Sequence, residues 1–278
     1  MDSRPATTLT LVADSAAQDL SYVGLADLAR ALDSSGKSAG ARLIGGHMMN
    51  LHCERWGLGL PRVTMDTDLG AFKLAYIDNS LVSILEELGY ERFRSNRWRR
   101  VVPDVEAGLE QLAVEERFAI IDLLLAPTAS RARKNVAVGR LKTIEVPGLA
   151  EALREPGVEL TLGMTRLNGV KLGATMTIPS EPRALTLKAL AWDRRQAAKD
   201  AVDIWRGLKV CFAAEAGPEC FQSDSDRQAL AAIRCAFGDL EGLGMTALRT
   251  EEGLSETSSK KRHTEIRGLA LEVLDLAL

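Results

Sequence analysis

Residues 43–68 read LIGGHMMNLHCERWGLGLPRVTMDTD, and this stretch decides the fold. Its short apolar start runs into Gly45-Gly46, which we interpret as a tight turn from a strand into a helix. The backbone N–H groups at such a turn are able to face an anion such as phosphate. A pair of glycines alone is weak evidence for that role, because it is more often only a turn.

The same stretch ends on two carboxylates, Asp66 and Asp68. Side chains alternate along an extended strand, so Thr64, Asp66 and Asp68 are expected to project from one face. Carboxylates held side by side repel each other, and a hard divalent cation such as Mg²⁺ removes that repulsion. The competing interpretation is a solvated strand without metal, because this pattern of acids is common.

A third acid, Asp122, interrupts the apolar run FAIIDLLL of residues 118–125. This run has the length of a buried strand. Burial of an unpaired carboxylate is costly, so Asp122 needs a metal, a cationic partner or a place at the strand end that faces water. Three carboxylates on neighbouring strands fit a site in which two metal ions act on an in-line displacement.

The residue composition and pattern of the sequence change near Pro179 and Pro182. Two prolines in four residues discourage regular structure, and long helical patterns rich in Ala and Leu follow them. We therefore predict an α/β (α+β) protein with two domains. Residues 1–180 would form a mixed sheet with flanking helices, and residues 181–278 a helical domain.

Turn and linker signals divide the later part of the chain. Asn168-Gly169 lies between the strand candidates 160–162 and 174–178 and is a strong hairpin signal. The polar, basic segment Ser255 to His263 suggests a linker before a last helix, Glu265 to Leu278.

Residues 185–208 are typical of one amphipathic helix with a cationic stripe. Lys188, Arg195 and Lys199 fall on that stripe at 3.6 residues per turn. A solvated face is the competing interpretation, in which Lys199 and Asp203 form an i,i+4 ion pair.

Taken in order, these motifs resemble the nucleotidyltransferases of the DNA polymerase β superfamily, and within it the AbiEii/AbiGii toxin-like group. The resemblance spans about residues 41–206 and therefore most of the chain. Each motif is loose alone, whereas the ordered set is moderately specific. The matching residues are Gly45-Gly46, Arg62-x-Thr64-x-Asp66-x-Asp68, Asp122, Lys188, Arg194 or Arg195, and Lys199-Asp200-x-x-Asp203.

The resemblance implies a nucleotidyltransferase fold and an enzyme that depends on a divalent metal, Mg²⁺ or Mn²⁺. By that resemblance Asp66, Asp68 and Asp122 are the metal ligands and the catalytic acids. Lys188 would complete the catalytic set by reaching the triphosphate.

The nucleotide is expected to lie on a second group of residues. The resemblance implies that Gly45, Gly46 and Thr64 shape the phosphate turn, and that Arg195 and Lys199 add positive charge. The chain departs from the family's pattern at His47, where the family places a small hydroxyl residue within or after the glycine turn.

Two basic clusters suit an RNA acceptor. Residues 91–100 hold five arginines and two aromatic residues, and residues 131–142 hold further arginines and lysines. Arginine with interleaved aromatic residues suits backbone phosphates and unstacked bases. The competing interpretation is an exposed strand edge on which charge discourages aggregation.

Composition sets the broad class. The net charge of -3 argues against a protein that binds nucleic acid over its whole surface. A local basic groove is compatible with this net charge. Four cysteines show no C-x-x-C pair, and no apolar signal segment opens the chain, so we expect a cytoplasmic protein with reduced thiols. No apolar run approaches the roughly twenty residues that a membrane helix needs.

Two functions compete. In the first, the enzyme moves a nucleoside monophosphate from a nucleoside triphosphate to an acceptor hydroxyl. RNA, particularly a tRNA end, is the favoured acceptor, with a protein hydroxyl or a small antibiotic as alternatives, and a toxin of this kind would have an antitoxin partner. In the second, the protein is a catalytically silent, nucleotidyltransferase-like regulator that binds nucleotide or a partner, an alternative suggested by His47.

Overall fold

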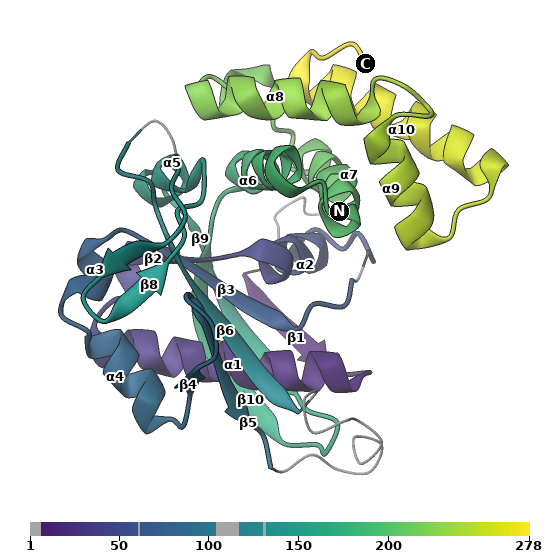
Figure 1. Cartoon of the computed structure of the whole chain (residues 1–278). Helices are drawn as coiled ribbons and strands as arrows, with labels where there is room; N and C mark the ends of the chain where they lie inside the picture. The colour runs from purple at the N-terminus through teal and green to yellow at the C-terminus, as the bar shows by residue number, and fades with distance from the viewer. Residues whose placement is uncertain (1–6, 61, 104–116, 130–131) are drawn as a thin grey trace. The chain divides into compact units, whose positions relative to one another are not determined.

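The computed structural model of the chain describes residues 7–60, 62–103, 117–129 and 132–278. The chain divides into two compact units, the first of residues 1–50 and 61–179 and the second of residues 51–60 and 180–278. Strands lie in the first unit and the second is helical, as Figure 1 shows. The predicted fold class, mixed sheets with flanking helices followed by a helical region, is confirmed.

The larger sheet of the first unit is mixed. Among the described residues it has the strand order β2-β3-β6-β5-β4, in which β3 and β6 run parallel and the other neighbours are antiparallel (Figure 1). Its central strands, β3 and β6, are mostly buried and carry apolar residues. The strands are β2 (Ala41–Ile44), β3 (Asp66–Ala71), β4 (Glu91–Arg92), β5 (Arg97–Val101) and β6 (Phe118–Leu125).

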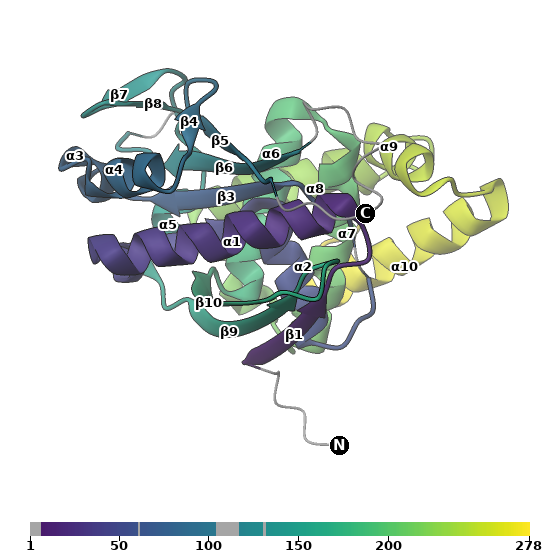
Figure 2. The ribbon, with the colours of Figure 1, turned by 90° about the horizontal axis from the view of Figure 1, so that it is seen from below.

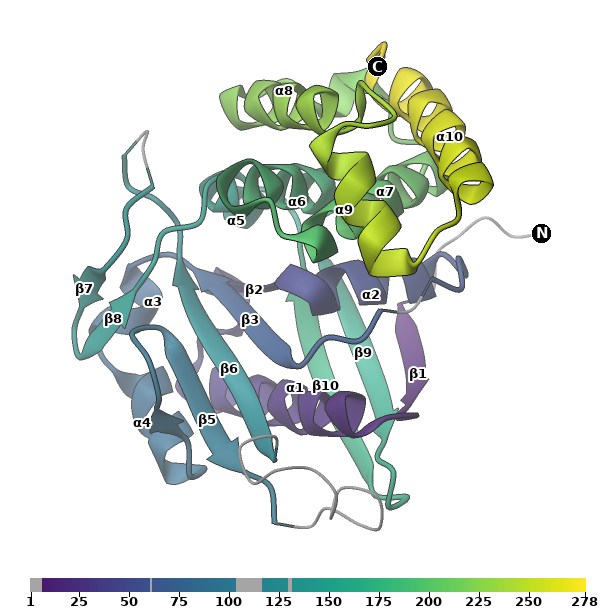
Figure 3. The same ribbon diagram turned by 45° about the vertical axis from the view of Figure 1, so that its right-hand side comes forward.

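A smaller sheet joins the two ends of the first unit. In the described part of the chain it has the order β1-β9-β10, from β1 (Thr8–Val12), β9 (Val158–Thr165) and β10 (Lys171–Ile178) (Figure 3). Strand β1 is parallel to β9, and β9 and β10 are antiparallel. The hairpin predicted at Asn168-Gly169 is confirmed, because Gly169 turns the chain between β9 and β10 with a φ of +80°.

Helix α1 (Ala16–Ser35) lies between the two sheets and contacts β3, β6 and β10 (Figure 2). Gly24 of α1 makes this approach possible, because a Cβ atom there would lie 2.8 Å from Oγ1 of Thr67 in β3. Thr67 is fully buried by the helix. Since side chains alternate, Asp66 and Asp68 lie on the opposite face of the sheet from α1.

Shorter elements complete the first unit. Leu149 at the start of α5 packs against Gly70 of β3, where an added Cβ atom would lie 2.7 Å from the leucine side chain. Helix α4 packs on α1. These elements are the 3-10 turn Ser38–Gly40, α3 (Leu74–Ile77), α4 (Ser80–Glu87), the hairpin β7 (Val136–Val138) and β8 (Leu141–Thr143), and α5 (Leu149–Arg154).

The second unit is a helical bundle with its own apolar core. Trp192, Trp205 and Phe237 are among the buried side chains of that core. None of the helices within the described ranges is both long and apolar enough to cross a membrane. The helices are α6 (Glu181–Arg195), α7 (Ala198–Ala213), the 3-10 turn Pro218–Cys220, α8 (Asp224–Phe237), α9 (Leu243–Glu252) and α10 (Glu256–Leu274).

Two predictions about these helices are wrong. Residues 185–208 are not one helix, because Gln196 adopts a left-handed conformation with a φ of +48° and ends α6 before α7 begins. The segment 255–263 is not a linker, because α10 already begins at Glu256. The hydroxyl of Ser255 accepts a hydrogen bond from the backbone N–H of Ser258 and so caps the helix at this point.

Candidate functional site

The glycine pair forms the predicted turn from a strand into a helix. Strand β2 ends at Ile44, and helix α2 (Gly45–Arg55) begins at the next residue, where Gly45 has a φ of +73°. A Cβ atom on Gly45 would lie 1.9 Å from Oδ2 of Asp68, and one on Gly46 would lie 2.5 Å from Oγ1 of Thr64. The turn therefore packs directly against the predicted acid strand, and its glycines leave the room that these side chains occupy.

The sheet register brings two of the predicted acids and one arginine into a single row. Asp68 of β3 lies opposite Asp122 of β6, and Asp122 lies opposite Arg97 of β5. Residues directly opposite one another on neighbouring strands point to the same face. Asp66, two residues before Asp68, points to that face as well.

Arg97 holds two of the acids by hydrogen bonds. Its Nε donates to Oδ1 of Asp122 at 3.0 Å, and its Nη2 donates to Oδ2 of Asp122 at 2.7 Å and to Oδ2 of Asp66 at 2.6 Å. The hydrogen bonds with Asp122 raise the pKa of the Arg97 guanidinium above its already high value, so it is charged at any physiological pH. Asp122 is buried, and Arg97 is the cationic partner that was one of the three expected ways to compensate its charge.

The acids are suited to a hard cation, although they are not arranged as a ready-made three-ligand centre. Within residues 7–60, 62–103, 117–129 and 132–278, no group of three His, Cys, Asp or Glu side chains is placed to hold a metal ion. Asp68 supplies a carboxylate oxygen beside the Gly45 turn, and Asp66 lies on the same face of β3. Mg²⁺ is usually held by one or two carboxylates together with substrate phosphates, so these two side chains are of the kind that such an ion prefers.

His47 is buried behind the glycine turn. Its side chain is 4% exposed, and burial, with a smaller contribution from the charge of Arg62, lowers its pKa from 6.5 to about 3. Its Nε2 has no hydrogen-bond partner among the described residues. The ring is therefore neutral at physiological pH, and it supplies no charge that would attract a phosphate.

Lys188 of the second unit takes part in a buried ion-pair network. Its Nζ lies 2.7 Å from Oδ2 of Asp203 and 3.9 Å from Oδ1 of Asp200. Asp203 also accepts a hydrogen bond from Nη1 of Arg206 at 2.9 Å. All four side chains are nearly inaccessible to solvent, so the charge of Lys188 is already compensated within its own unit.

The other two predicted cations of the second unit differ from each other. Arg195 reaches across the break between α6 and α7 and donates to both oxygens of Asp200, at 2.5 and 2.8 Å. Lys199 is exposed, and no ion pair involves it in the part of the chain that the structure describes. Of the predicted cation set, Lys188 and Arg195 therefore share Asp200, whereas Lys199 stands outside the network.

The two basic clusters of the sequence meet in the first unit. The guanidinium of Arg92 in β4 donates to the backbone carbonyl of Arg140, in the turn between β7 and β8, at 3.0 Å. Because a carbonyl carries no net charge, this contact leaves the positive charge of Arg92 uncompensated. Lys134 and Lys142 are exposed and form no ion pair within the described ranges.

Several arginines of these clusters are instead paired with acids. Arg100 donates two hydrogen bonds to Asp27 of α1, and Arg133 binds the buried carboxylate of Glu145. Such pairs hold the fold together and reduce the positive charge that remains for a partner. The paired arginines are Arg97, Arg99, Arg100, Arg133 and Arg140. Arg131 lies outside the described residues.

An aromatic stack lies on the same sheet face as the acids. The guanidinium of Arg99, two residues after Arg97, lies 4.1 Å from the ring centroid of Phe93 and 4.4 Å from that of Phe118. Phe93 is 47% exposed. This face therefore carries acids at one point and an exposed aromatic ring with arginine beside it at another.

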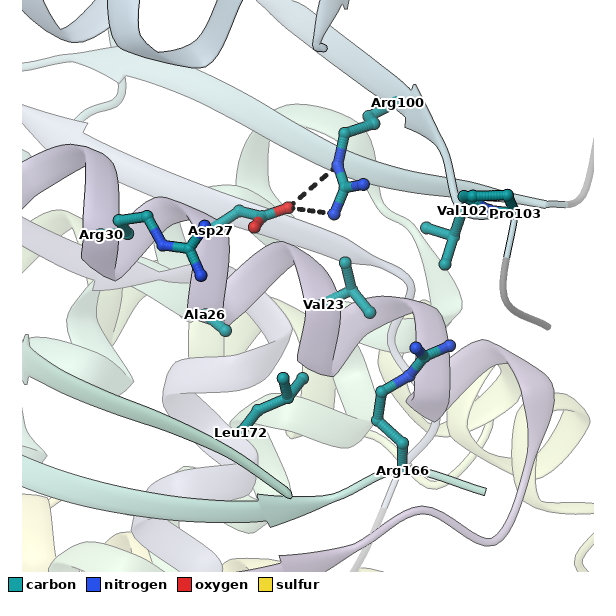
Figure 4. A pocket seen from close by; sticks show the side chains of 9 residues that line it. All are labelled: Val23, Ala26, Asp27, Arg30, Arg100, Val102, Pro103, Arg166 and Leu172. Carbon is teal, nitrogen blue, oxygen red and sulfur yellow. Dashed lines mark hydrogen bonds and ion pairs between the residues drawn. The ribbon is translucent and has the colours of Figure 1, made fainter. Parts of the chain in front are cut away.

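The opposite face of the larger sheet contains a separate cavity. It has a volume of about 230 Å³, and Figure 4 shows Arg30, Arg100 and Arg166 around an apolar floor that includes Val23 and Leu172. Arg100 points to this side because it is three residues from Arg97 on the same strand. The cavity is therefore not part of the acid site.

Arg97 was not among the predicted site residues. In the sequence it is one of five similar arginines in residues 91–100, and strand register alone selects it as the partner of Asp122. The available signal was the period of two in residues 97–101, which places Arg97 and Arg99 on one face and Trp98 and Arg100 on the other.

Comparisons with known proteins give distant structural similarity alone. No protein-family model matches the chain, and no curated protein matches it. A solved structure that it resembles is an antigenic nucleotidyltransferase-like protein from Paracoccidioides brasiliensis, with 19% identity and a TM-score of 0.43. The match covers 84% of this chain and 93% of the other.

Proposed function

We propose that the protein is a nucleotidyltransferase that moves a nucleoside monophosphate from a nucleoside triphosphate to an acceptor hydroxyl. The observation that carries the proposal is the contact between the Gly45 turn and Asp68. A left-handed glycine turn at the start of a helix, packed on a strand with two carboxylates on one face, combines a place for phosphate with ligands for the cation that accompanies phosphate.

Asp66 and Asp68 would hold one Mg²⁺ or Mn²⁺ ion, which would neutralise charge on the phosphates and polarise the reacting phosphorus. The acceptor oxygen attacks the α-phosphorus, a P–O bond forms, and the bond to the β-phosphate oxygen breaks as pyrophosphate leaves. Asp122, held by Arg97, would position or deprotonate the acceptor hydroxyl. Asp66 and Asp68 would keep the triphosphate in line with that oxygen.

The roles of the second-unit cations are also part of the proposal. Lys188, with Arg195 or Lys199, would offset negative charge on the departing pyrophosphate.

RNA is the acceptor that the surface favours. Exposed Phe93 offers a ring on which an unpaired base stacks, and Arg92, Lys134 and Lys142, which form no ion pair among the described residues, supply positive charge for its backbone. A tRNA end is the form of RNA that the toxin-like sequence motifs suggest. A protein of that toxin type would require an antitoxin partner in the cytoplasm.

The experiment is transfer of label from each α-³²P-labelled nucleoside triphosphate in the presence of Mg²⁺ or Mn²⁺ and total cellular RNA. Asp66→Ala removes one of the two proposed metal ligands. Asp14→Ala is the matched control, because Asp14 is exposed and lies in a loop before α1. We expect labelled RNA from the wild type and the control but not from Asp66→Ala. Absence of label on RNA, protein and small molecules, or equal labelling by Asp66→Ala, would reject the proposal.

A second candidate function is a catalytically silent nucleotide-binding regulator. Arg97 favours it, because this guanidinium allows Asp66 and Asp122 to lie close together without a metal ion. Thermal unfolding separates the two functions. Stabilisation by a nucleoside triphosphate only with Mg²⁺ present is expected of the enzyme, whereas Mg²⁺-independent stabilisation is expected of the regulator.

A further inference from the structure

Arg97 lies between two of the three acids, Asp66 and Asp122, and donates hydrogen bonds to both. It approaches Asp122 through two nitrogens and Asp66 through one of the same nitrogens, at distances between 2.6 and 3.0 Å. This is the two-nitrogen geometry in which arginine binds a carboxylate most strongly. A cation is therefore built into the site as part of the chain.

The hydrogen bonds of Arg97 differ between its two acidic partners. Both oxygens of Asp122 already accept hydrogen bonds from Arg97, whereas Asp66 is engaged by Arg97 through Oδ2.

We propose that the guanidinium of Arg97 takes the place of a second metal ion. The site then binds a single divalent ion, on Asp66 and Asp68. Asp122 remains the partner of Arg97 and is not a metal ligand. Arg97 is thus a positioning residue that sets the number of metal ions. This inference rests on the proposed function, because it assumes that the carboxylates of Asp66 and Asp68 bind a metal ion.

The fold gives a physical reason for this arrangement. Asp122 is buried in the middle of the sheet, with its side chain 9% exposed, and a carboxylate there needs a permanent partner even before nucleotide arrives. The antiparallel register of β5 and β6 places Arg97 opposite Asp122, so the partner comes from the neighbouring strand without any loop movement.

The test counts Mn²⁺ ions bound per chain, by electron paramagnetic resonance of the free ion. The full chain is titrated with Mn²⁺ alone and with Mn²⁺ plus the α,β-methylene analogue of ATP, which cannot transfer its nucleotide. The variants are Asp66→Asn, Asp68→Asn, Asp122→Asn, Arg97→Gln and the double variant of Arg97→Gln with Asp122→Asn. Arg99→Gln is the matched control, because Arg99 lies on the same face and strand but pairs with Glu91.

We expect the wild type to bind one Mn²⁺ ion. Asp66→Asn and Asp68→Asn should lose it, and Asp122→Asn should keep it with an affinity within about threefold of the wild type. Arg97→Gln should bind a second ion, or bind the first about tenfold more tightly, which is the scale on which neighbouring residues alter metal sites. Arg99→Gln should behave as the wild type does.

The double variant keeps the test valid if Arg97→Gln alone fails to fold, because it removes both partners of the buried pair together. It should return the site to one ion, since the gain in Arg97→Gln comes from the released Asp122. Two ions in the wild type, loss of the ion in Asp122→Asn, or unchanged binding in a folded Arg97→Gln would overturn the inference and leave the proposed function standing. No Mn²⁺ binding by the wild type under either condition would overturn the proposed function itself.

Discussion

Gly45 and Asp68 pack so closely that the first has no room for a side chain. A Cβ atom on Gly45 would lie 1.9 Å from Oδ2 of Asp68, and the backbone of Gly45 has a φ of +73°. The contact ties the turn between β2 and α2 to the strand that carries the acids. It makes residue 45 a sensitive probe of the proposed phosphate and metal site.

We predict that Gly45→Ala lowers the free energy of unfolding by about 3 kcal/mol, because it combines a strained positive φ with an overlap in a packed region. The variant should also lose stabilisation by Mg²⁺ and nucleotide, since Asp68 must move to make room. Urea denaturation with and without Mg²⁺ and a nucleoside triphosphate measures both effects.

Gly36→Ala is the control for this prediction. Gly36 ends α1 with a φ of +65°, and no atom of the described residues lies within 4 Å of the position that its Cβ atom would take. This variant therefore has the backbone strain without the overlap and should cost about 1 kcal/mol. Equal losses from the two variants would show that Asp68 imposes no restriction on residue 45.

His47 should make the folded protein less stable as the pH falls. Its pKa is about 3 in the folded chain against 6.5 for an ordinary histidine, so the unfolded chain binds more protons between these two values. Stability from this residue is therefore complete above about pH 6.5 and decreases toward pH 3, by about 1.4 kcal/mol per pH unit at most.

His47→Leu removes this dependence while keeping an apolar side chain in the buried position. Between pH 7 and pH 5 the wild type should lose about 2 kcal/mol more of its unfolding free energy than the variant does. The other titrating groups are the same in both proteins, so their contributions cancel in the difference. Parallel stability curves over this range would contradict the buried, neutral state of His47.

Lys188 should contribute to the stability of the second unit in the absence of any ligand. Lys188→Met leaves the buried Asp203 with one cation fewer, and we expect the free energy of unfolding to fall by about 3 kcal/mol. Lys199→Met changes an exposed lysine in the first turn of α7 and should alter the free energy of unfolding by no more than about 0.5 kcal/mol. Guanidinium chloride denaturation of the two variants checks this, and a similar, small effect in both would contradict the network.

Phe93 should contribute to RNA binding. Phe93→Ala should weaken binding of a fluorescent single-stranded RNA by about 1–3 kcal/mol, because a base loses its stacking partner. Phe212 in α7 is equally exposed, at 47%, and Phe212→Ala is the matched control that should leave the affinity unchanged. Fluorescence anisotropy at fixed salt measures both, and equal affinities for Phe93→Ala and Phe212→Ala would remove this ring from the acceptor surface.

Local patterns predicted a large part of the first unit correctly. The strand-to-helix turn at Gly45, the acid strand at Asp66 and the hairpin at Asn168-Gly169 all depend on neighbouring residues, whose backbone preferences act whatever the rest of the chain does. The same local reasoning failed for residues 185–208, because helical periodicity continues through Gln196 while the backbone does not.

Partners that are distant in the sequence were beyond such patterns. The sequence does not distinguish the five arginines in residues 91–100. The register of β5 against β6 places Arg97 beside Asp122, and Arg100, on the other face of β5, pairs with Asp27. The assignment of residues 51–60 to the helical unit is of the same kind, because compact packing and not chain order defines a unit.

The amino-acid sequence alone determined the fold class and the chemistry that the chain has at its disposal, since alternation, glycine turns and apolar runs act over a few residues. The tertiary structure decided which of those side chains meet. Asp122 is held by Arg97 and Lys188 by Asp203, because a buried charge must find a partner and the packing of strands and helices determines which partner is within reach.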